Sequence, residues 1–204
     1  MKKIYSLIVL LTMFFYSTTN AGNQTQKPAT KAAKKTLVVF FSRTGENYAV
    51  GNIKKGNTHI IAEMIAAQTD ATLFEIKPKN AYPAEYHACT EAAKKEKESN
   101  ARPAITADIA VENYDVIFIG YPNWWGDMPM PVYTFIEKHK WQGKTIIPFC
   151  THEGSGLSNT ESNIKKACQG ATVLEGLAVK GSVAQNQQAS AQKTVLRWIN
   201  GLGL

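Results

Sequence analysis

Cysteine is scarce in this 204-residue sequence, and the three cysteines that occur are far apart. Cys89, Cys150 and Cys168 form no C-x-x-C pair, which is the spacing used by most zinc sites and dithiol redox centres. Either two of them form one disulfide and leave one thiol, or all three are buried thiols. The cysteines therefore predict neither a metal site nor a catalytic function.

Motifs of hydrolases and of nucleic-acid-binding proteins are also missing. The sequence has no G-x-S-x-G serine motif, and no acid is evident to orient His152 toward Cys150. The formal net charge is +7, yet the lysines are scattered among alanines and glutamates and form no dense basic stripe. We therefore expect no hydrolytic site, no nucleic-acid partner and a solvated surface.

The amino end has an apolar run that is too short to span a membrane, which takes about 20 residues. This run, residues 4–16, follows Lys2 and Lys3 and precedes a stretch of small and polar residues, 17–21, that fits a cleavage site. The pattern predicts a cleaved signal peptide at residues 1–21 and export to the periplasm or the extracellular space. No stable membrane span remains after cleavage; a retained anchor is the alternative.

The rest of the chain is predicted to be a leader followed by one domain. Residues 22–35 are polar and basic, which is typical of a flexible leader. From residue 36 to residue 204, short apolar runs alternate with longer amphipathic ones. The predicted strands are residues 37–41, 71–76, 114–120, 144–150 and 172–177. One predicted helix starts at residue 57, and the others span residues 83–100, 132–139, 159–168 and 185–199. This alternation predicts an α/β domain with a doubly wound parallel sheet and helices on both faces.

Ligands of such sheets bind outside the carboxyl ends of the strands, where the strand order reverses. The loops after the first, third and fourth predicted strands are therefore the candidate binding site. The candidate residues are Ser42, Arg43, Thr44, Gly56, Asn57 and Thr58 in the first loop, Pro122, Asn123, Trp124, Trp125, Gly126 and Asp127 in the second, and Thr151, His152, Gly154, Ser155 and Gly156 in the third.

The three loops offer different chemistry. The first supplies hydroxyls and backbone N–H groups just before a helix, which favours a phosphate. The second supplies indole rings, and the third supplies more backbone donors with an imidazole. Together they predict a site for a phosphorylated planar ring. Two simpler explanations stay open: Trp124 and Trp125 could form a lid or a protein-binding patch, and Ser42 and Thr58 could cap a helix.

These loops resemble those of the flavodoxin family. The phosphate loop of that family reads S/T-x-T-G-x-T, which residues 42–44 (S-R-T) and 56–58 (G-N-T) match if residues 45–55 are an insertion. The second loop of the family often reads W-G-D, as residues 125–127 do. The resemblance runs from residue 36 to the carboxyl end and implies a five-stranded parallel sheet, in the order 2-1-3-4-5, that binds FMN.

The resemblance also implies how FMN would be held. The phosphate would lie in the first loop and the isoalloxazine ring between the other two, stacked on Trp125 or on its neighbour Trp124. Gly126 would be the residue whose peptide turns when the flavin is reduced, which glycine permits because both signs of φ are open to it. The chain departs from the family in its basic charge and in His152, which stands where a tyrosine often stacks.

The implied function is electron transfer by bound FMN, to redox partner proteins or to a small acceptor. One alternative is an FMN-dependent NAD(P)H:quinone-type oxidoreductase, and another is a non-redox module that binds flavin or a partner. No second nucleotide motif is found in the sequence, which favours the carrier over the enzyme. The sequence assigns no catalytic residue and no metal ligand.

Overall fold

The computed structural model describes residues 34–204. The predicted signal peptide, residues 1–21, and residues 22–33 of the predicted leader lie outside the described residues. Between residues 34 and 204, no helix combines the length and the hydrophobicity that a membrane crossing requires.

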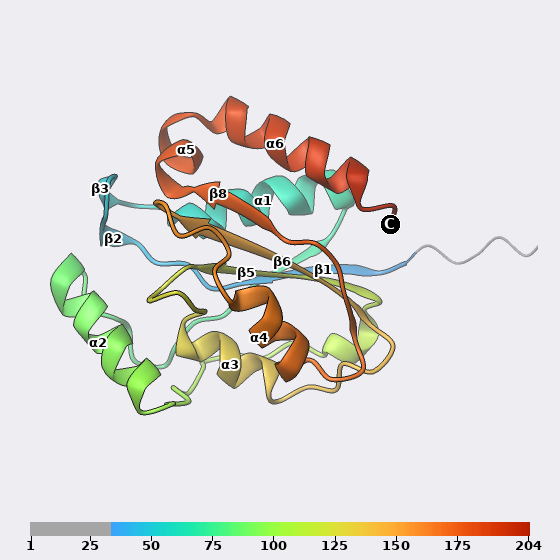
Figure 1. Ribbon diagram of the computed structural model, residues 1–204, viewed down its shortest axis with the longest axis horizontal. Coiled ribbons are helices and arrows are strands. Elements are labelled where there is room, and N and C mark those ends of the chain that lie inside the picture. Colours follow the sequence, from blue (N-terminus) through green and yellow to red (C-terminus); the bar gives the residue numbers. More distant parts are fainter. Residues whose placement is uncertain (1–33) are drawn as a thin grey trace, which may run out of the picture. The chain divides into compact units, whose positions relative to one another are not determined.

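A parallel sheet forms the centre of the described domain (Figure 1). Its spatial order is β4 (Thr72–Glu75), β1 (Thr36–Phe40), β5 (Val116–Pro122), β6 (Thr145–His152) and a fifth strand in two pieces, β7 (Thr172–Val173) and β8 (Leu177–Lys180). Every neighbouring pair in this sheet is parallel. With β7 and β8 counted as one strand, and a small separate hairpin left aside, the order is 2-1-3-4-5. This confirms the predicted doubly wound α/β sheet.

Continuous apolar sequence places the central strands in the interior. Leu37 and Val38 of β1 have no exposed surface, and neither have Ile117 and Phe118 of β5. Leu37 pairs with Ile117 and Val38 pairs with Phe118. Successive side chains of a strand point to opposite faces, so strands that are apolar throughout require a cover on both faces of the sheet.

Helices supply that cover on each side of the sheet (Figure 1). Val38 belongs to a core with Ile61 of one helical layer, and Val39 belongs to a second core with Phe135 of the other layer. One layer consists of α1 (Asn57–Thr69), α5 (Gly181–Asn186) and α6 (Gln188–Gly201), and the other of α3 (Met130–Ile136), α4 (Thr160–Ala167) and the short 3-10 helix η1 (Val111–Asn113).

Two elements lie beyond the carboxyl ends of the strands. The predicted insertion folds as an antiparallel hairpin of β2 (Gly45–Asn47) and β3 (Gly51–Ile53). Helix α2 (Tyr86–Glu98) lies beside this hairpin and contacts β2 and α3, not a face of the sheet (Figure 1). Only Cys89 and Ala93 of α2 are buried, which agrees with the solvated helix expected from its charged sequence.

The fifth strand differs from the predicted segment, residues 172–177, because it is broken and ends later. β7 pairs with the start of β6 and β8 pairs with its end, so the break lies opposite Pro148. The carbonyl of Ile146 accepts the N–H of Leu174, and Pro148, two residues further on, faces the same neighbour. The ladder is interrupted there because proline has no N–H to donate.

Three other expectations meet a clear outcome. The predicted closing helix, residues 185–199, is two helices, because Gln187 (φ −138°, ψ 48°) leaves the helical conformation between α5 and α6. Helix α3 starts at Met130, earlier than predicted, since a proline fits the first turn of a helix. All three cysteines are free and buried, which confirms the alternative without a disulfide.

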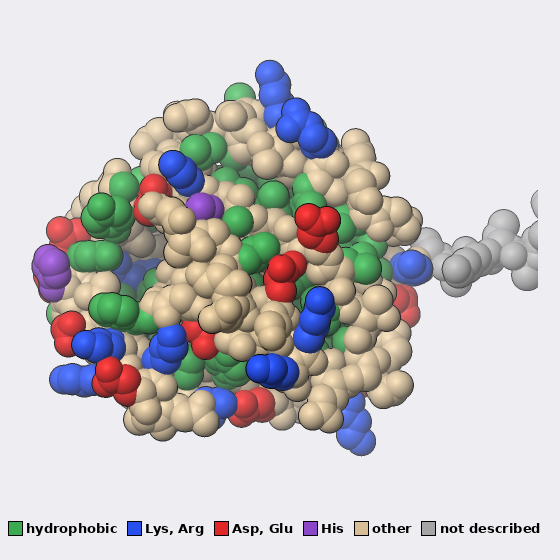
Figure 2. Space-filling model, in the orientation of Figure 1, with side chains coloured by type: hydrophobic (Ala, Val, Ile, Leu, Met, Phe, Trp, Pro, Cys, Tyr) green, Lys and Arg blue, Asp and Glu red, His purple; other side chains and the backbone are tan. Residues whose placement is uncertain are grey.

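Charged side chains of both signs are interspersed on the face of the molecule shown in Figure 2. Ion pairs such as Lys55 with Glu63 and Arg102 with Glu137 join partly exposed side chains. Such pairs usually contribute about 0–1 kcal/mol each to stability. The distribution matches the mixed-charge surface expected from the sequence.

Candidate functional site

Three loops lie together at the carboxyl ends of β1, β5 and β6. Thr58 Oγ1 of the first loop is 2.8 Å from Thr151 Oγ1 at the start of the third, and both side chains are buried. Asn123 of the second loop donates from Nδ2 to the Gly156 carbonyl of the third at 2.7 Å. Residues that are up to about a hundred positions apart in the chain are therefore held in one cluster.

The two halves of the first loop, residues 42–44 and 56–58, meet at the base of the hairpin that separates them in the chain. A Cβ placed on Gly56 would lie 2.1 Å from Ser42 Oγ and 2.5 Å from the carbonyl oxygen of Arg43. The two halves of the loop are in direct contact, and this position has room for glycine only. Ser42 Oγ in turn accepts the N–H of His59 at 3.1 Å, which ties the first half of the loop to α1.

The amino end of α1 is the candidate anion-binding point. Asn57 and Thr58 are its first two residues, and amides at these positions have no carbonyl of a preceding turn to bind. The side chain of Asn57 is directed to α5, where its Oδ1 accepts Nε2 of Gln185 at 2.9 Å. The backbone of this segment, rather than the Asn57 amide group, is therefore the part that suits an anion.

The other predicted residues of the first loop, Ser42, Arg43 and Thr44, have different surroundings. The Arg43 guanidinium donates to the carbonyls of Pro83 and Ala84 at 2.8 and 2.7 Å, which joins the loop to the segment before α2. Ser42 and Thr44 line a separate cavity of about 530 Å³, together with Arg43 and the lysines 54, 55 and 77. Ser42 and Thr44 do not line the space beside the tryptophans.

The second loop makes a tight turn at Trp124–Asp127. The N–H of Trp124 donates to the Asp127 carbonyl at 2.9 Å, and the N–H of Asp127 donates back at 3.1 Å. Trp125 (φ 56°) and Gly126 (φ 76°) are both left-handed, as in a type I′ turn. Glycine accepts this conformation freely, whereas a tryptophan there is strained.

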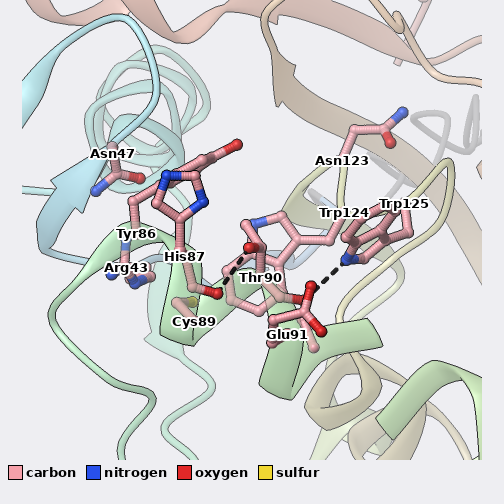
Figure 3. Close-up of a pocket in the computed structure, with 11 residues that line it drawn as sticks. Arg43, Asn47, Tyr86, His87, Cys89, Thr90, Glu91, Asn123, Trp124 and Trp125 are labelled. Carbon is pink, nitrogen blue, oxygen red and sulfur yellow. Dashed lines mark hydrogen bonds between the residues drawn. The ribbon is translucent and has the colours of Figure 1, made fainter. Parts of the chain in front are cut away.

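The two tryptophans have different surroundings. Trp124 is half-buried and packs edge-to-face on Phe41 and Tyr82, with ring centroids 5.4 and 5.0 Å apart. Trp125 is 49% exposed, and its indole N–H donates to the Thr90 carbonyl of α2 at 3.0 Å (Figure 3). Trp124 is therefore oriented by the core and Trp125 by α2.

Polar side chains hold the rest of the second loop. Asp127 Oδ1 accepts the hydroxyl of Tyr133 and Nδ2 of Asn163, both at 2.9 Å, and the N–H of Met128 at 2.7 Å. Asn123 Oδ1 accepts the N–H of Gly126 at 3.0 Å. The Asp127 carboxylate is thus a structural acceptor. Burial raises the pKa of Tyr133, and the hydrogen bond to Asp127 and the charge of Asp127 raise it further.

His152 orders the third loop. Its Nδ1 accepts the N–H of Gly154 at 2.9 Å and of Gly156 at 3.1 Å, so the proton of the neutral ring is on Nε2. Burial lowers the pKa of His152, Lys180 lowers it further, and Glu153 opposes the shift. Protonation would place a donor on Nδ1 and break both hydrogen bonds.

This arrangement predicts a loss of stability in mild acid. Because the pKa of His152 is lower in the folded protein than its usual value near 6.5, the unfolded chain takes up more protons as the pH falls through 6.5. The free energy of unfolding therefore falls toward pH 5. Thermal unfolding midpoints measured at pH 7.5 and at pH 5 should fall less for His152→Asn, whose amide does not titrate, than for the native protein.

The exposed His87 of α2 provides the matched control for this prediction, because it is a histidine in a different element from the third loop. His87→Asn should keep the full fall in the midpoint. Equal falls in the native protein and in His152→Asn would contradict a role for His152 in holding the loop.

No catalytic group is evident beside this loop in the described residues. The Cys150 thiol donates to the Gly156 carbonyl at 3.2 Å, and burial raises its pKa to about 12, so it is a neutral thiol at physiological pH. Within residues 34–204, no group of three or more histidine, cysteine or acidic side chains is placed to hold a metal ion.

Two adjoining cavities lie between the loops, the hairpin and α2. The smaller is about 150 Å³ and the larger, between α2 and the tryptophan turn, is about 420 Å³ (Figure 3). Asn47, Tyr86, Asn123 and Trp124 line both cavities. Other predicted residues line one of them: Asn57, Pro122, Thr151 and His152 the smaller, and Arg43 and Trp125 the larger. Gly154 and Ser155 are at the exposed tip of the third loop and line neither.

The site residues that the sequence analysis missed come from the hairpin and α2. Asn47, Tyr48 and Tyr86 line the smaller cavity, and the rings of Tyr48 and Tyr86 are tilted on each other with centroids 6.0 Å apart. Tyr48 is 63% exposed. The sequence signal for these residues was a tyrosine in the insertion and another at the start of a charged helix. Such segments build no core of their own, so a large aromatic side chain in them indicates a binding surface.

Comparisons with known proteins agree with this geometry. A family model described as flavodoxin matches residues 35–195. No curated protein matches the chain.

Several solved structures are similar to this chain over most of its length. A protein of Bacteroides uniformis ATCC 8492, assigned as a flavoprotein, is 32% identical, with 82% of this chain and 98% of that chain covered and a TM-score of 0.66. One from Bacteroides eggerthii DSM 20697, assigned likewise, is 29% identical, with 84% and 99% covered and a TM-score of 0.67. A flavoprotein in complex with FMN from Lactobacillus acidophilus NCFM is 25% identical, with 77% and 99% covered and a TM-score of 0.57.

Proposed function

Because the chain belongs to the flavodoxin family, we propose that it binds FMN in the three-loop cluster and uses it to transfer electrons. The observation that carries this proposal is the junction of an anion-binding helix end with an aromatic cavity. Asn57, the first residue of α1, lines the smaller cavity, and Trp124 lines both cavities. A similar protein was solved in complex with FMN, which supports this choice of ligand.

The sizes of the two cavities support a ligand that spans them. Small-molecule sites usually measure about 300–1,000 Å³, so the cavity of about 150 Å³ suits the phosphate end of a ligand and not a whole nucleotide. The adjoining cavity of about 420 Å³ is within the usual range and is walled by the tryptophans. We place the phosphate at the amino end of α1 and the ring beside Trp124.

The residues of the chain have distinct parts in this proposal. FMN supplies reversible transfer of one or two electrons when it is bound. The α1 amides bind the phosphate, Trp124 presents an aromatic surface held by Phe41 and Tyr82, and Asn123 fixes the second loop against the third. Helix α2 and the hairpin form walls of the larger cavity.

A second candidate function is reduction of a small acceptor by a nicotinamide through FMN. The observation in its favour is that α2 forms one wall of the cavity in which we place the flavin ring, because an electron carrier needs only an exposed flavin edge. The carrier remains our first proposal, since the sequence has no second nucleotide motif. The partners of such a carrier would be redox proteins. The mixed surface charge does not favour a nucleic-acid partner.

Two measurements on purified protein separate these functions. Anaerobic reductive titration followed by absorption should resolve separate one-electron steps for a carrier. Direct oxidation of NADPH in the presence of a quinone would instead support the reductase. Bound flavin that is not reduced reversibly would support a non-redox module.

The phosphate site leads to a prediction on selectivity. The protein should bind one FMN per chain and bind riboflavin about fivefold to thirtyfold more weakly, because an anion at a helix amino end with hydrogen-bonding amides is worth about 1–2 kcal/mol. Fluorescence titration of the apoprotein with each ligand measures this ratio. Equal dissociation constants for FMN and riboflavin would remove the phosphate site from the proposal.

Export is a separate proposal that rests on residues 1–21 of the sequence alone. Amino-terminal sequencing of protein recovered from the producing cell would test it. A mature chain starting near residue 22 supports cleavage, and a chain that keeps residues 1–21 contradicts it.

A further inference from the structure

The turn of the second loop needs support from outside itself. Trp125 is a bulky residue at φ 56°, a conformation that non-glycine residues rarely adopt because Cβ and the backbone are crowded. Such conformations persist only where the surrounding structure imposes them, and they are frequent at ligand sites. In this protein the support comes from α2.

Four contacts hold the peptide and the side chain of Trp125. The Lys97 ammonium of α2 donates to the Trp125 carbonyl, and the indole N–H donates to the Thr90 carbonyl at 3.0 Å (Figure 3). The Lys94 ammonium lies 5.6 Å from the centroid of the indole ring. On the other side, Asn123 Oδ1 accepts the N–H of Gly126 at 3.0 Å, so both polar groups of the Trp125–Gly126 peptide are occupied.

The next peptide is less constrained. The N–H of Asp127 closes the turn on Trp124, but no donor to the Gly126 carbonyl is found among residues 34–204. A Cβ on Gly126 would meet only Ser158, at 4.0 Å, so there is space around this residue. Within residues 34–204 the Gly126 carbonyl therefore has no hydrogen-bond donor, whereas the Trp125 carbonyl has Lys97.

We propose that α2 is a clamp on this turn and that Lys97 is its positioning residue. Lys97 holds the Trp125 carbonyl toward α2, which keeps Trp125 left-handed and keeps its ring at the wall of the larger cavity. This inference rests on the proposed function for its ligand, but the clamp itself is a property of the protein without FMN. Loss of the clamp lowers the population of the binding-competent turn and raises the apparent dissociation constant in proportion.

The expected size of the effect is moderate because Lys97 is exposed to water. Exposed ionic contacts are weak, and the indole hydrogen bond to Thr90 remains when Lys97 is replaced. We expect Lys97→Met to weaken FMN binding by about threefold to tenfold. Helix α2 buries only Cys89 and Ala93, so the clamp is not backed by a packed core.

The first test uses the apoprotein. The indole N–H of Trp125, assigned by its loss in Trp125→Phe, is followed by two-dimensional ¹⁵N–¹H NMR. Lys97→Met should shift this signal and speed its hydrogen exchange at least threefold, and Lys97→Arg should restore both. Lys95→Met is the matched control, because Lys95 is an exposed lysine of the same helix whose side chain makes none of these contacts.

The second test is a double-mutant cycle on FMN affinity. Glycine at position 125 adopts φ 56° without strain, so Lys97→Met should cost less than twofold in a Trp125→Gly background if its role is to hold that conformation. An unchanged indole signal in Lys97→Met, or equal Lys97→Met effects in both backgrounds, would overturn the clamp. If the protein binds no FMN at all, the proposed function fails, and the indole signal alone then decides the clamp.

Discussion

Gly56→Ala is expected to disable the first loop, with a loss of FMN affinity of at least about tenfold and a fall in the free energy of unfolding of about 1–3 kcal/mol. The new Cβ would lie 2.1 Å from Ser42 Oγ and 2.5 Å from the Arg43 carbonyl oxygen. The Arg43 oxygen is backbone and cannot rotate away, so the two halves of the loop must separate. Isothermal titration with FMN and chemical denaturation measure the two effects.

A control for this prediction is available at the end of α6. A Cβ added to Gly201 would have no atom within 4 Å outside its own helix and chain neighbours, so Gly201→Ala should leave both quantities unchanged or raise stability slightly. Gly56 itself has an ordinary φ of −68°, so its replacement introduces no backbone strain, only a steric clash. Native FMN affinity in Gly56→Ala would show that the contact between the loop halves has no part in binding.

Trp124→Ala should weaken FMN binding by about 1–3 kcal/mol, which is the scale for losing an aromatic stacking surface. It should also lower the free energy of unfolding by about 2–3 kcal/mol, because Trp124 packs on Phe41 and Tyr82 and its removal leaves a partial cavity there. Trp124→Phe keeps an aromatic ring and should recover most of the affinity. Fluorescence titration of the apoprotein with FMN gives the dissociation constants.

The comparison with Trp125→Ala decides which ring lies against the flavin. Trp125 borders only the larger cavity and is turned to Thr90, so its replacement should cost less affinity than that of Trp124. A larger loss for Trp125→Ala would assign the stacking surface to Trp125. Unchanged affinity in both variants would identify the pair as a lid over the core.

The sheet could be predicted because its central strands are mainly apolar. Leu37 and Ile117 belong to uninterrupted apolar runs, and such runs separated by amphipathic segments favour a parallel sheet. The break in the fifth strand was harder to foresee, because its cause is Pro148 in the neighbouring strand. The pattern within residues 172–177 carries no information about that neighbour.

The three loops of the candidate site could also be predicted, whereas the walls around them could not. Strand ends identify Asn57, Asn123 and Thr151 from local sequence alone. Tyr86 reaches the site through contacts between distant segments, such as those of the Arg43 guanidinium with the carbonyls before α2. The left-handed conformation of Trp125 was equally hidden, since residues of α2 impose it.

The hairpin of β2 and β3 leaves the first loop and returns to it at one point, where Gly56 touches Ser42 and Arg43. A module with adjacent ends can be lengthened, shortened or exchanged without moving the strands that carry it, because loop length adds little to the entropy cost of closure. In this protein the hairpin also contacts the segment that precedes α2, since the N–H of Glu46 donates to the Ala84 carbonyl at 2.9 Å. Diversification of the hairpin would therefore reshape the entrance of the cavity while the sheet and the anion-binding end of α1 stay the same.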